Sequence, residues 1–229
     1  MQTKPRKQES TGFDFLKLWP ILFVPATLYV VMQFGNDYAN ILVAILFFGV
    51  FAFKSDMRTR RLMLVLAAMG NIFETANTAA GFYKYIGTLG APLWIPLGWA
   101  VLGWWVASME GEFRKISMKT GMAVTSAALL LSPLAVGSIS ISSIIAIAGL
   151  YCISLASRLP YAAFGFTALF SIMLEYMGTT IGAWQYFDPM GSGAPIPPNL
   201  AALAMAYATA LALCLWISGF EKPEGKGEK

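Results

Sequence analysis

The sequence predicts an all-α membrane protein, a bundle of about eight transmembrane helices built from two parallel four-helix pseudo-repeats. Three observations lead to this prediction. Of the 229 residues, 57% are hydrophobic and 12% are charged, and the mean hydropathy is +0.63, whereas soluble domains have about 45–50% apolar and about 25% charged residues. Long apolar runs recur from residue 15 to residue 220 with short connections. A glutamate motif in the first half of the chain returns about one hundred residues later.

A transmembrane helix needs about 20 mostly apolar residues, and the apolar runs give the expected spans in order. They lie at 15–34, 39–53, 62–81, 91–109, 119–136, 138–156, 160–181 and 195–219. The first run lacks a following small-residue cleavage site, so we expect it to stay as a span. The polar ends 1–14 and 221–229 have no apolar face to pack, and we expect them to be cytoplasmic tails around two four-helix halves, 15–110 and 111–220.

Basic residues predict the orientation of these spans. Lys84 clearly falls on one side of the membrane, and a large set falls on the other: Lys4, Arg6, Lys7, Lys54, Arg58, Arg60, Arg61, Arg114, Lys115, Lys119, Arg158, Lys222, Lys226 and Lys229. Because cytoplasmic loops carry an excess of lysine and arginine, both termini are expected in the cytoplasm of a cell with this protein in its plasma or inner membrane. The net charge of +4 is explained by these loops, so a nucleic-acid partner is not expected.

The glutamate motif indicates an internal duplication. The matched positions are Glu74 with Glu175, Thr78 with Thr179, Gly81 with Gly182, Tyr83 with Trp184, Tyr85 with Tyr186 and, after a two-residue difference, Gly90-Ala91-Pro92 with Gly193-Ala194-Pro195. The offset corresponds to four spans, an even number, so the two halves would share one orientation, as in parallel membrane repeats. Glycine, alanine and threonine coincide easily in membrane helices, but a shared glutamate does not.

Glu74 and Glu175 are the predicted catalytic residues. A charged carboxylate at mid-membrane costs at least about 2.5–3.5 kcal/mol, so such residues face the bundle interior and are functional candidates. The predicted spans that carry them contain no lysine or arginine. The carboxyls would therefore stay protonated, or share a proton or a water-filled pocket, and either arrangement makes a proton donor. The alternative is that they only tie helices together by hydrogen bonds.

Polar and aromatic residues near the two glutamates are the predicted substrate-binding set. The set comprises Asn71, Asn77, Thr78, Tyr83, Tyr85, Trp94, Thr179, Trp184 and Tyr186. The polar members stand within a turn or so of a glutamate, and aromatic rings beside an acid can stabilise a carbocation. Tyrosine and tryptophan also form ordinary belts at membrane interfaces, which is the alternative explanation for the aromatic members.

Several kinds of chemistry are excluded by composition. The chain has no histidine, the commonest metal ligand and general base, and Cys152 and Cys214 lie in apolar runs, where a thiol behaves as a small hydrophobe. No metal site and no cofactor are expected. The sequence has neither paired Asp-rich motifs for Mg²⁺ nor a glycine-rich dinucleotide fingerprint, which argues against diphosphate and redox chemistry.

The motif also resembles a known group of proteins. Its carriers are Glu74, Thr78, Gly81, Tyr83, Tyr85, Gly90, Pro92, Pro96 and Trp99, with Glu175, Trp184, Tyr186 and Pro195 as a second set. Over about a third of the chain this pattern resembles the membrane carotenoid-biosynthesis proteins that include bisanhydrobacterioruberin hydratase, and it is more distantly similar to small membrane lycopene cyclases and membrane terpene cyclases.

The resemblance implies a cofactor-independent enzyme of the lyase or isomerase type. Such an enzyme would protonate a carotenoid or another isoprenoid dissolved in the lipid bilayer, and water addition or ring closure would follow. Two other classes remain open from the residues alone. One is a proton-coupled small-molecule transporter with duplicated halves, and the other is a structural membrane subunit.

Overall fold

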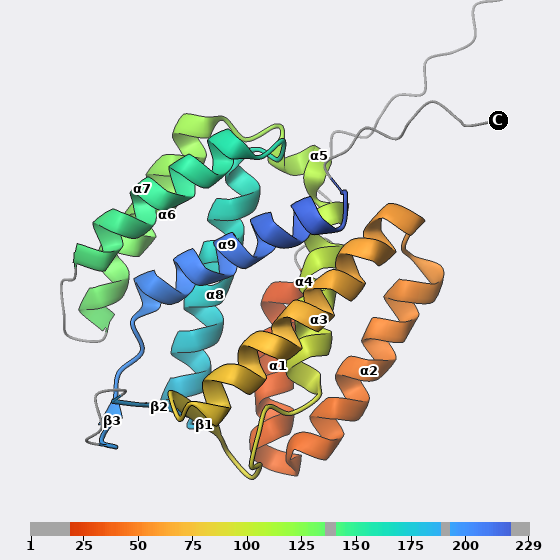
Figure 1. The fold of residues 1–229 in the computed structure, drawn as a ribbon, viewed down its shortest axis with the longest axis vertical. Helices are drawn as coiled ribbons and strands as arrows, with labels where there is room; N and C mark the ends of the chain where they lie inside the picture. The colour runs from red at the N-terminus through yellow and green to blue at the C-terminus, as the bar shows by residue number, and fades with distance from the viewer. Residues whose placement is uncertain (1–18, 136–140, 189–192, 221–229) are drawn as a thin grey trace, which may run out of the picture.

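The computed structural model describes residues 19–135, 141–188 and 193–220, and this part of the chain is mainly helical (Figure 1). Its elements, in order, are α1 (Trp19–Phe34), α2 (Asn36–Phe53), α3 (Met57–Ala79), β1 (Tyr83–Tyr85), α4 (Trp94–Ser108), α5 (Glu110–Phe113), α6 (Met118–Ala135), α7 (Ile141–Ala156), α8 (Tyr161–Thr180), β2 (Trp184–Phe187), β3 (Pro195–Ile196) and α9 (Leu200–Ile217). The predicted tails 1–14 and 221–229 and the connection 136–140 lie outside the described residues.

Each predicted apolar run contains a helix, and α5 is an additional single turn in the connection after α4. Four helices, α2, α3, α8 and α9, are long and apolar enough to cross a membrane. The helix α4 has 15 residues, which at 1.5 Å per residue is shorter than the roughly 30 Å of a bilayer core. The described parts of α1 and α7 have 16 residues each. The helix α4 begins at Trp94, after Pro92, so the predicted run from residue 91 is shortened at its start.

The outer surface of the bundle is apolar. Large side chains such as Leu22, Ile45, Phe48, Leu64 and Trp216 are exposed on α1, α2, α3 and α9. Soluble monomers rarely expose broad apolar surfaces of this kind. Hydrocarbon around these helices would remove the cost of that exposure, and four of the helices are long and apolar enough to cross a membrane.

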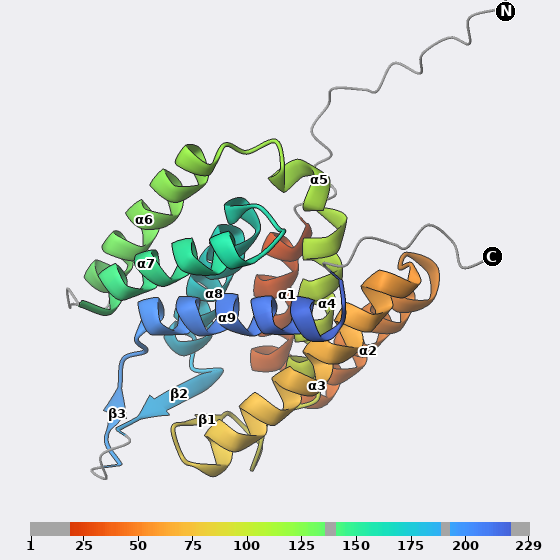
Figure 2. The same ribbon diagram turned by 45° about the horizontal axis from the view of Figure 1, so that its top comes forward.

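The helices pack in two groups that follow chain order. In the first group α4 lies against α2 and α3, and in the second α9 lies against α7 and α8. The groups meet where α3 contacts α9 and where α1 contacts α8, among other contacts. Figure 2 shows α9 crossing the middle of the molecule, with α1 and α4 behind it and the strands below.

Charged connections gather at the end of the bundle opposite the strands. Arg58, near the start of α3, donates from Nε to the carbonyl oxygen of Phe220 at 2.5 Å and places its guanidinium 3.7 Å from the centre of the Phe220 ring. Arg58 and Arg114 both pair with Glu110, at 3.6 Å and 2.7 Å. Lys84 lies in β1 at the other end (Figure 1). The predicted separation of Lys84 from the other described basic residues is therefore present in the fold.

Three short strands are the main departure from the predicted all-α architecture. They form one antiparallel sheet in the order β1-β2-β3. The strands are two to four residues long, below the length at which alternation of apolar and polar residues identifies a strand in a sequence. Their pairing also joins segments about one hundred residues apart, which no local pattern reveals.

Candidate functional site

The ends of α3 and α8 have the same backbone geometry. Gly81 and Gly182 follow these helices with φ of 78° and 80°, in the left-handed region that glycine adopts without steric cost. After each glycine the chain closes a Schellman motif: the N–H of Phe82 donates to the carbonyl of Asn77, and the N–H of Ala183 donates to the carbonyl of Gly178. After α3 and again after α8, the chain therefore turns back beneath the helix that it has just left.

Alanine at Gly81 or Gly182 is expected to lower the free energy of unfolding by about 1–2 kcal/mol, because a Cβ disfavours the left-handed backbone. No heavy atom lies within 4 Å of the added Cβ at either position, so the effect reports backbone strain alone. Asparagine should cost less than alanine at the same sites, since it tolerates this conformation better. Thermal unfolding of the purified variants in detergent measures the order.

Gly49→Ala is the matched control for this series, since Gly49 lies inside α2 without a left-handed φ and also has open space around its Cβ. Alanine there should be neutral or stabilising. Equal stability of wild type and Gly182→Ala would mean that α8 does not end in the left-handed turn.

The strands that follow the two turns pair with each other. In the β1–β2 register Tyr83 faces Tyr186, and Tyr85 faces Trp184. Side chains alternate across a strand, so these four aromatic residues share one face, and Lys84 and its partner are exposed on the other. The ring centres of Tyr83 and Tyr186 are 5.2 Å apart, and those of Tyr85 and Trp184 are 5.8 Å apart. The sheet therefore presents a layer of aromatic side chains to the helix ends.

Glu74 is buried above this layer, with 3% of its surface exposed. Its Oε2 accepts hydrogen bonds from the hydroxyl groups of Tyr83 and of Tyr85, the latter at 2.7 Å. Its Oε1 accepts from Nε1 of Trp99 on α4 at 3.3 Å. One strand and one neighbouring helix thus supply three donors to a carboxyl that would otherwise be unsatisfied.

Glu175 has an equivalent set of donors and is 5% exposed. Its Oε2 accepts from Nε1 of Trp184 at 3.0 Å and from the Tyr186 hydroxyl at 2.8 Å, and its Oε1 accepts from the Tyr207 hydroxyl on α9 at 3.1 Å. For each glutamate, two donors stand nine and eleven residues later in the chain. The third donor comes from the next helix in the chain, α4 for Glu74 and α9 for Glu175.

These third donors contact each other between the two helix groups. The rings of Trp99 and Tyr207 are stacked, with centres 4.4 Å apart and an interplanar angle of 20°. The carboxyls of Glu74 and Glu175 are therefore linked through one aromatic pair as well as through the sheet. Neither Trp99 nor Tyr207 is among the residues predicted to form the site. Trp99 does occur in the resemblance motif, and Tyr207 has only the signal of a single tyrosine in an alanine-rich apolar helix.

Two glycines make room for the indole donors. A Cβ at Gly70 would lie 2.7 Å from the ring of Trp99, and a Cβ at Gly178 would lie 2.0 Å from the ring of Trp184. Real Cβ atoms do not approach this closely. Each indole thus lies directly against the backbone of the helix that carries its carboxyl partner.

Both carboxyls line one cavity of about 340 Å³, between α3, α9 and the sheet. Its walls also include Phe73, Asn77, Phe82, Phe187, Leu203 and Tyr207. The side chains are mostly aromatic or aliphatic, with few polar groups apart from the carboxyls and their donors. A cavity with apolar walls and a few converging polar groups is typical of a small-molecule site.

The tyrosines of the sheet are held in their protonated form. Burial raises the pKa of Tyr83, Tyr85 and Tyr186, and the nearest carboxylate is the next cause, Glu74 for the first two and Glu175 for the third. The pKa of Tyr83 is raised further by Glu175, and that of Tyr186 by Glu74. These phenols are therefore hydrogen-bond donors near neutral pH and are close enough to respond to both carboxyls.

The structure brings part of the predicted substrate-binding set to this cavity. Asn77, Tyr83, Tyr85, Trp184 and Tyr186 line it.

The other predicted members lie elsewhere. Trp94 packs against Tyr85 and Trp184 and donates from Nε1 to Oδ1 of Asn36 at 2.9 Å. The hydroxyls of Thr78 and Thr179 donate to the carbonyls of the glutamates one turn earlier in their helices. Asn71 is exposed on α3 and does not line the cavity.

The described residues contain no cluster of three or more histidine, cysteine, aspartate or glutamate side chains that could hold a metal ion. The carboxyls of Glu74 and Glu175 each accept hydrogen bonds from three protein donors. A comparison of the chain with protein-family models, with curated proteins and with solved structures finds no match.

Proposed function

We propose that this protein is an integral membrane enzyme that uses Glu74 and Glu175 for acid catalysis on a carotenoid or another isoprenoid lipid. The reaction is hydration or cyclisation of a carbon–carbon double bond. The observation that carries the proposal is the placement of two buried carboxyls, from distant parts of the chain, in one aromatic-walled cavity. No cofactor takes part in the proposed reaction.

The proposed membrane arrangement has eight spans in two parallel pseudo-repeats, with both termini in the cytoplasm and the cavity near the outer face of the plasma or inner membrane. Matching helix ends at Gly81 and Gly182, and donors at the same offsets from each glutamate, support the repeat. Lys84 lies at the end of the bundle that carries the sheet, away from the charged connections, and this position supports the orientation.

In the proposed reaction the two glutamates hold one proton between them, because two nearby carboxylates do not readily ionise together. The protonated one gives its proton to a carbon of the double bond, whose π electrons form the new C–H bond and leave a carbocation. For hydration, a water oxygen bonds to the cation and loses a proton to the other carboxylate. For cyclisation, a second double bond attacks the cation, and that carboxylate removes a proton from the ring formed. The pair ends with the proton count it had.

The aromatic residues have two roles in this proposal. Tyr83 and Tyr186 line the cavity, and an aromatic face attracts a cation by about 0.5–2 kcal/mol depending on how far the cation is desolvated. Their hydroxyls, with the indole N–H groups of Trp99 and Trp184, stabilise whichever glutamate is ionised. Asn77 is positioned at the cavity wall to contact the substrate or a water molecule.

A proton-coupled transporter remains the second candidate, because two matched halves around an acidic site are typical of transporters. The carboxyls lie only five residues before the ends of α3 and α8, near the sheet and away from the middle of the bundle. Transporter sites lie near the bilayer midplane, so this position favours the enzyme. Proton-dependent uptake of a solute into vesicles carrying the protein would favour the transporter.

The test of the enzyme is expression in cells that supply different acyclic carotenoid precursors, with the double variant Glu74→Gln/Glu175→Gln as control. Hydration adds the mass of one water to a pigment, and cyclisation leaves the mass unchanged while shifting its retention and absorption. We expect one such product with the wild type and none with the double variant. Identical pigments in cells with the wild type, with the double variant and without the protein would contradict the proposal.

A further inference from the structure

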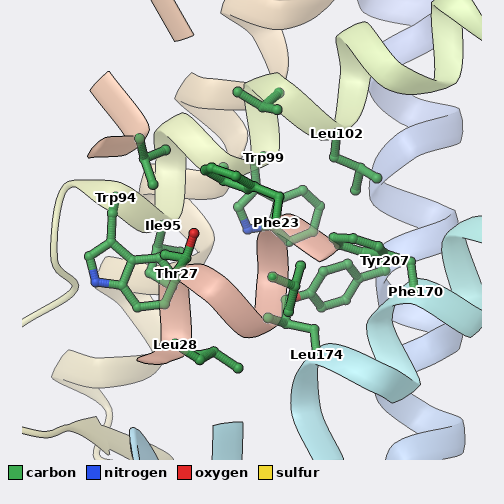
Figure 3. Close-up of a pocket in the computed structure, with 14 residues that line it drawn as sticks. Phe23, Thr27, Leu28, Trp94, Ile95, Trp99, Leu102, Phe170, Leu174 and Tyr207 are labelled. Carbon is green, nitrogen blue, oxygen red and sulfur yellow. The ribbon is translucent and has the colours of Figure 1, made fainter. Parts of the chain in front are cut away.

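A second cavity is lined by both members of the Trp99–Tyr207 pair. It has a volume of about 70 Å³ and lies between α1, α4 and α8 (Figure 3). Apolar side chains make up most of its wall, among them Phe23, Leu102, Phe170 and Leu174. Such a wall suits a hydrocarbon group.

One polar atom in this wall has no partner. The hydroxyl of Thr27 is buried, with 4% of the residue exposed, and makes no hydrogen bond. Other threonines within helices, such as Thr167 and Thr209, donate to the carbonyl one turn earlier. Figure 3 shows the Thr27 hydroxyl among the apolar side chains around the cavity. A buried hydroxyl without a partner is costly, so it indicates a missing hydrogen-bonding group in the cavity.

Water fits this position poorly. A buried water typically needs two to four polar partners. The indole N–H groups of Trp94 and Trp99 donate to Asn36 and Glu74, and the Tyr207 hydroxyl donates to Glu175. Among the described residues around the cavity, Thr27 is therefore the one whose side-chain donor is not engaged. The wall matches an apolar group that carries one oxygen beside Thr27.

The geometry points to a chain-binding subsite: we propose that this cavity holds the hydrocarbon chain of an oxygen-bearing isoprenoid, whose hydroxyl or carbonyl oxygen bonds to Thr27. Tyr207 lines this cavity and the carboxyl cavity alike, and Trp99 lines this cavity while it donates to Glu74. The two cavities are thus adjacent at Tyr207. The assignment rests on the proposed function and adds to it that the substrate carries an oxygen.

Binding of all-trans-retinol, a polyene alcohol, and of its deoxy hydrocarbon tests the subsite. The purified protein is used in detergent, and energy transfer from tryptophan to the polyene reports binding, since Trp94 and Trp99 line the cavity. The background is the double variant Glu74→Gln/Glu175→Gln, so that no turnover can occur. Binding is thus measured separately from catalysis.

Substitutions at two positions distinguish the contribution of the ligand's hydrocarbon chain to binding from that of its oxygen. Thr27→Val removes the hydroxyl at nearly constant shape and should weaken retinol binding about five-fold, the effect of one hydrogen bond. It should not change binding of the hydrocarbon. Thr27→Ser keeps a hydroxyl and should bind retinol as the Thr27 protein does. Gly98 lines the cavity and has open space beside it, so Gly98→Phe should fill the cavity and weaken both ligands at least ten-fold. Gly49→Phe, in open space on α2 and away from this cavity, should change neither.

Unchanged binding in Gly98→Phe overturns the subsite, and equal losses for both ligands in Thr27→Val overturn the role of the hydroxyl. The proposed function fails by a different result, the absence of any product that depends on the glutamates. If the wild type makes such a product and the Gly98→Phe variant binds retinol as well as its background does, the proposed function stands and the proposed subsite is wrong.

Discussion

Glu74→Gln and Glu175→Gln are each expected to lower product formation by about 10²-fold or more, the usual contribution of a general acid or base. In the proposed reaction one carboxyl donates the proton and the other accepts one, so removing either breaks the cycle. Glutamine has no transferable proton and no basic oxygen of comparable strength. The measurement is product formed per mole of protein, by chromatography of membrane extracts at matched expression.

Glutamine is the informative replacement because it can preserve the hydrogen bonds of both sites. The Trp99 indole can only donate, so at position 74 the amide oxygen must take the place of Oε1. The amide NH₂ then faces the hydroxyls of Tyr83 and Tyr85, and a hydroxyl can accept as well as donate.

At position 175 the same reasoning gives the opposite amide orientation. The amide oxygen stays with the Trp184 indole and the Tyr186 hydroxyl, and the NH₂ donates to Tyr207. The fold should therefore survive both substitutions, and a loss of product then reports lost proton transfer.

Glu112→Gln is the matched control, since Glu112 lies in α5 at the charged end of the bundle and pairs with Lys115 at 3.1 Å. It should leave product formation unchanged. Loss in only one of the two cavity variants would identify the proton donor and leave the other carboxyl as a positioning group. Product formation within two-fold of wild type in both cavity variants would contradict the acid–base pair.

Much of the fold follows from local sequence signals. Each apolar run gives one helix, because burying or embedding such a run satisfies its backbone internally. Gly81 and Gly182 mark the ends of α3 and α8, because a left-handed residue is needed there. The glutamates stand out for a physical reason too, since an acid in an apolar helix needs a compensating environment.

The part that the sequence did not predict depends on distant pairings. The β1–β2 register joins Lys84 to Gln185, and neither strand is long enough to be recognised alone. The contact of Tyr207 with Glu175 spans 32 residues and depends on how α9 crosses α8. Asn71 was predicted to bind substrate because it lies near Glu74 in sequence, but at i−3 its side chain is on an exposed part of α3.

The arrangement of donors gives a physical reason for placing glycine beside each carboxyl. Every donor side chain is an aromatic ring, so the carboxyls are satisfied without adding a charge to the cavity. Indoles are large, and their N–H must approach a carboxyl close to its own helix. Gly70 and Gly178 supply that space, which makes the helix surface at these two positions part of the site.

Gly178→Ala is therefore expected to cause the largest loss of stability among single small substitutions in the site. The new Cβ would lie 2.0–2.4 Å from three ring atoms of Trp184, and this indole is held by Glu175 at 3.0 Å and packed against Tyr85. Either the indole moves and its hydrogen bond breaks, or β2 separates from α8. Overpacking and the loss of a hydrogen bond to a charged group together cost about 3 kcal/mol. Thermal unfolding in detergent and product formation should both fall.

A second substitution tests the cause of that loss. Trp184→Phe replaces the indole at the crowded position with a smaller ring. It should lower the stability of the wild type, and it should lower the stability of the Gly178→Ala protein much less. The difference in unfolding free energy between the two backgrounds is the coupling energy, expected at about 1–3 kcal/mol for groups in contact. Gly49→Ala, with open space at its Cβ, controls for the general effect of alanine in a helix. Additive effects of Gly178→Ala and Trp184→Phe would show that the indole does not lie against α8, and with it the proposed support of Glu175 would be wrong.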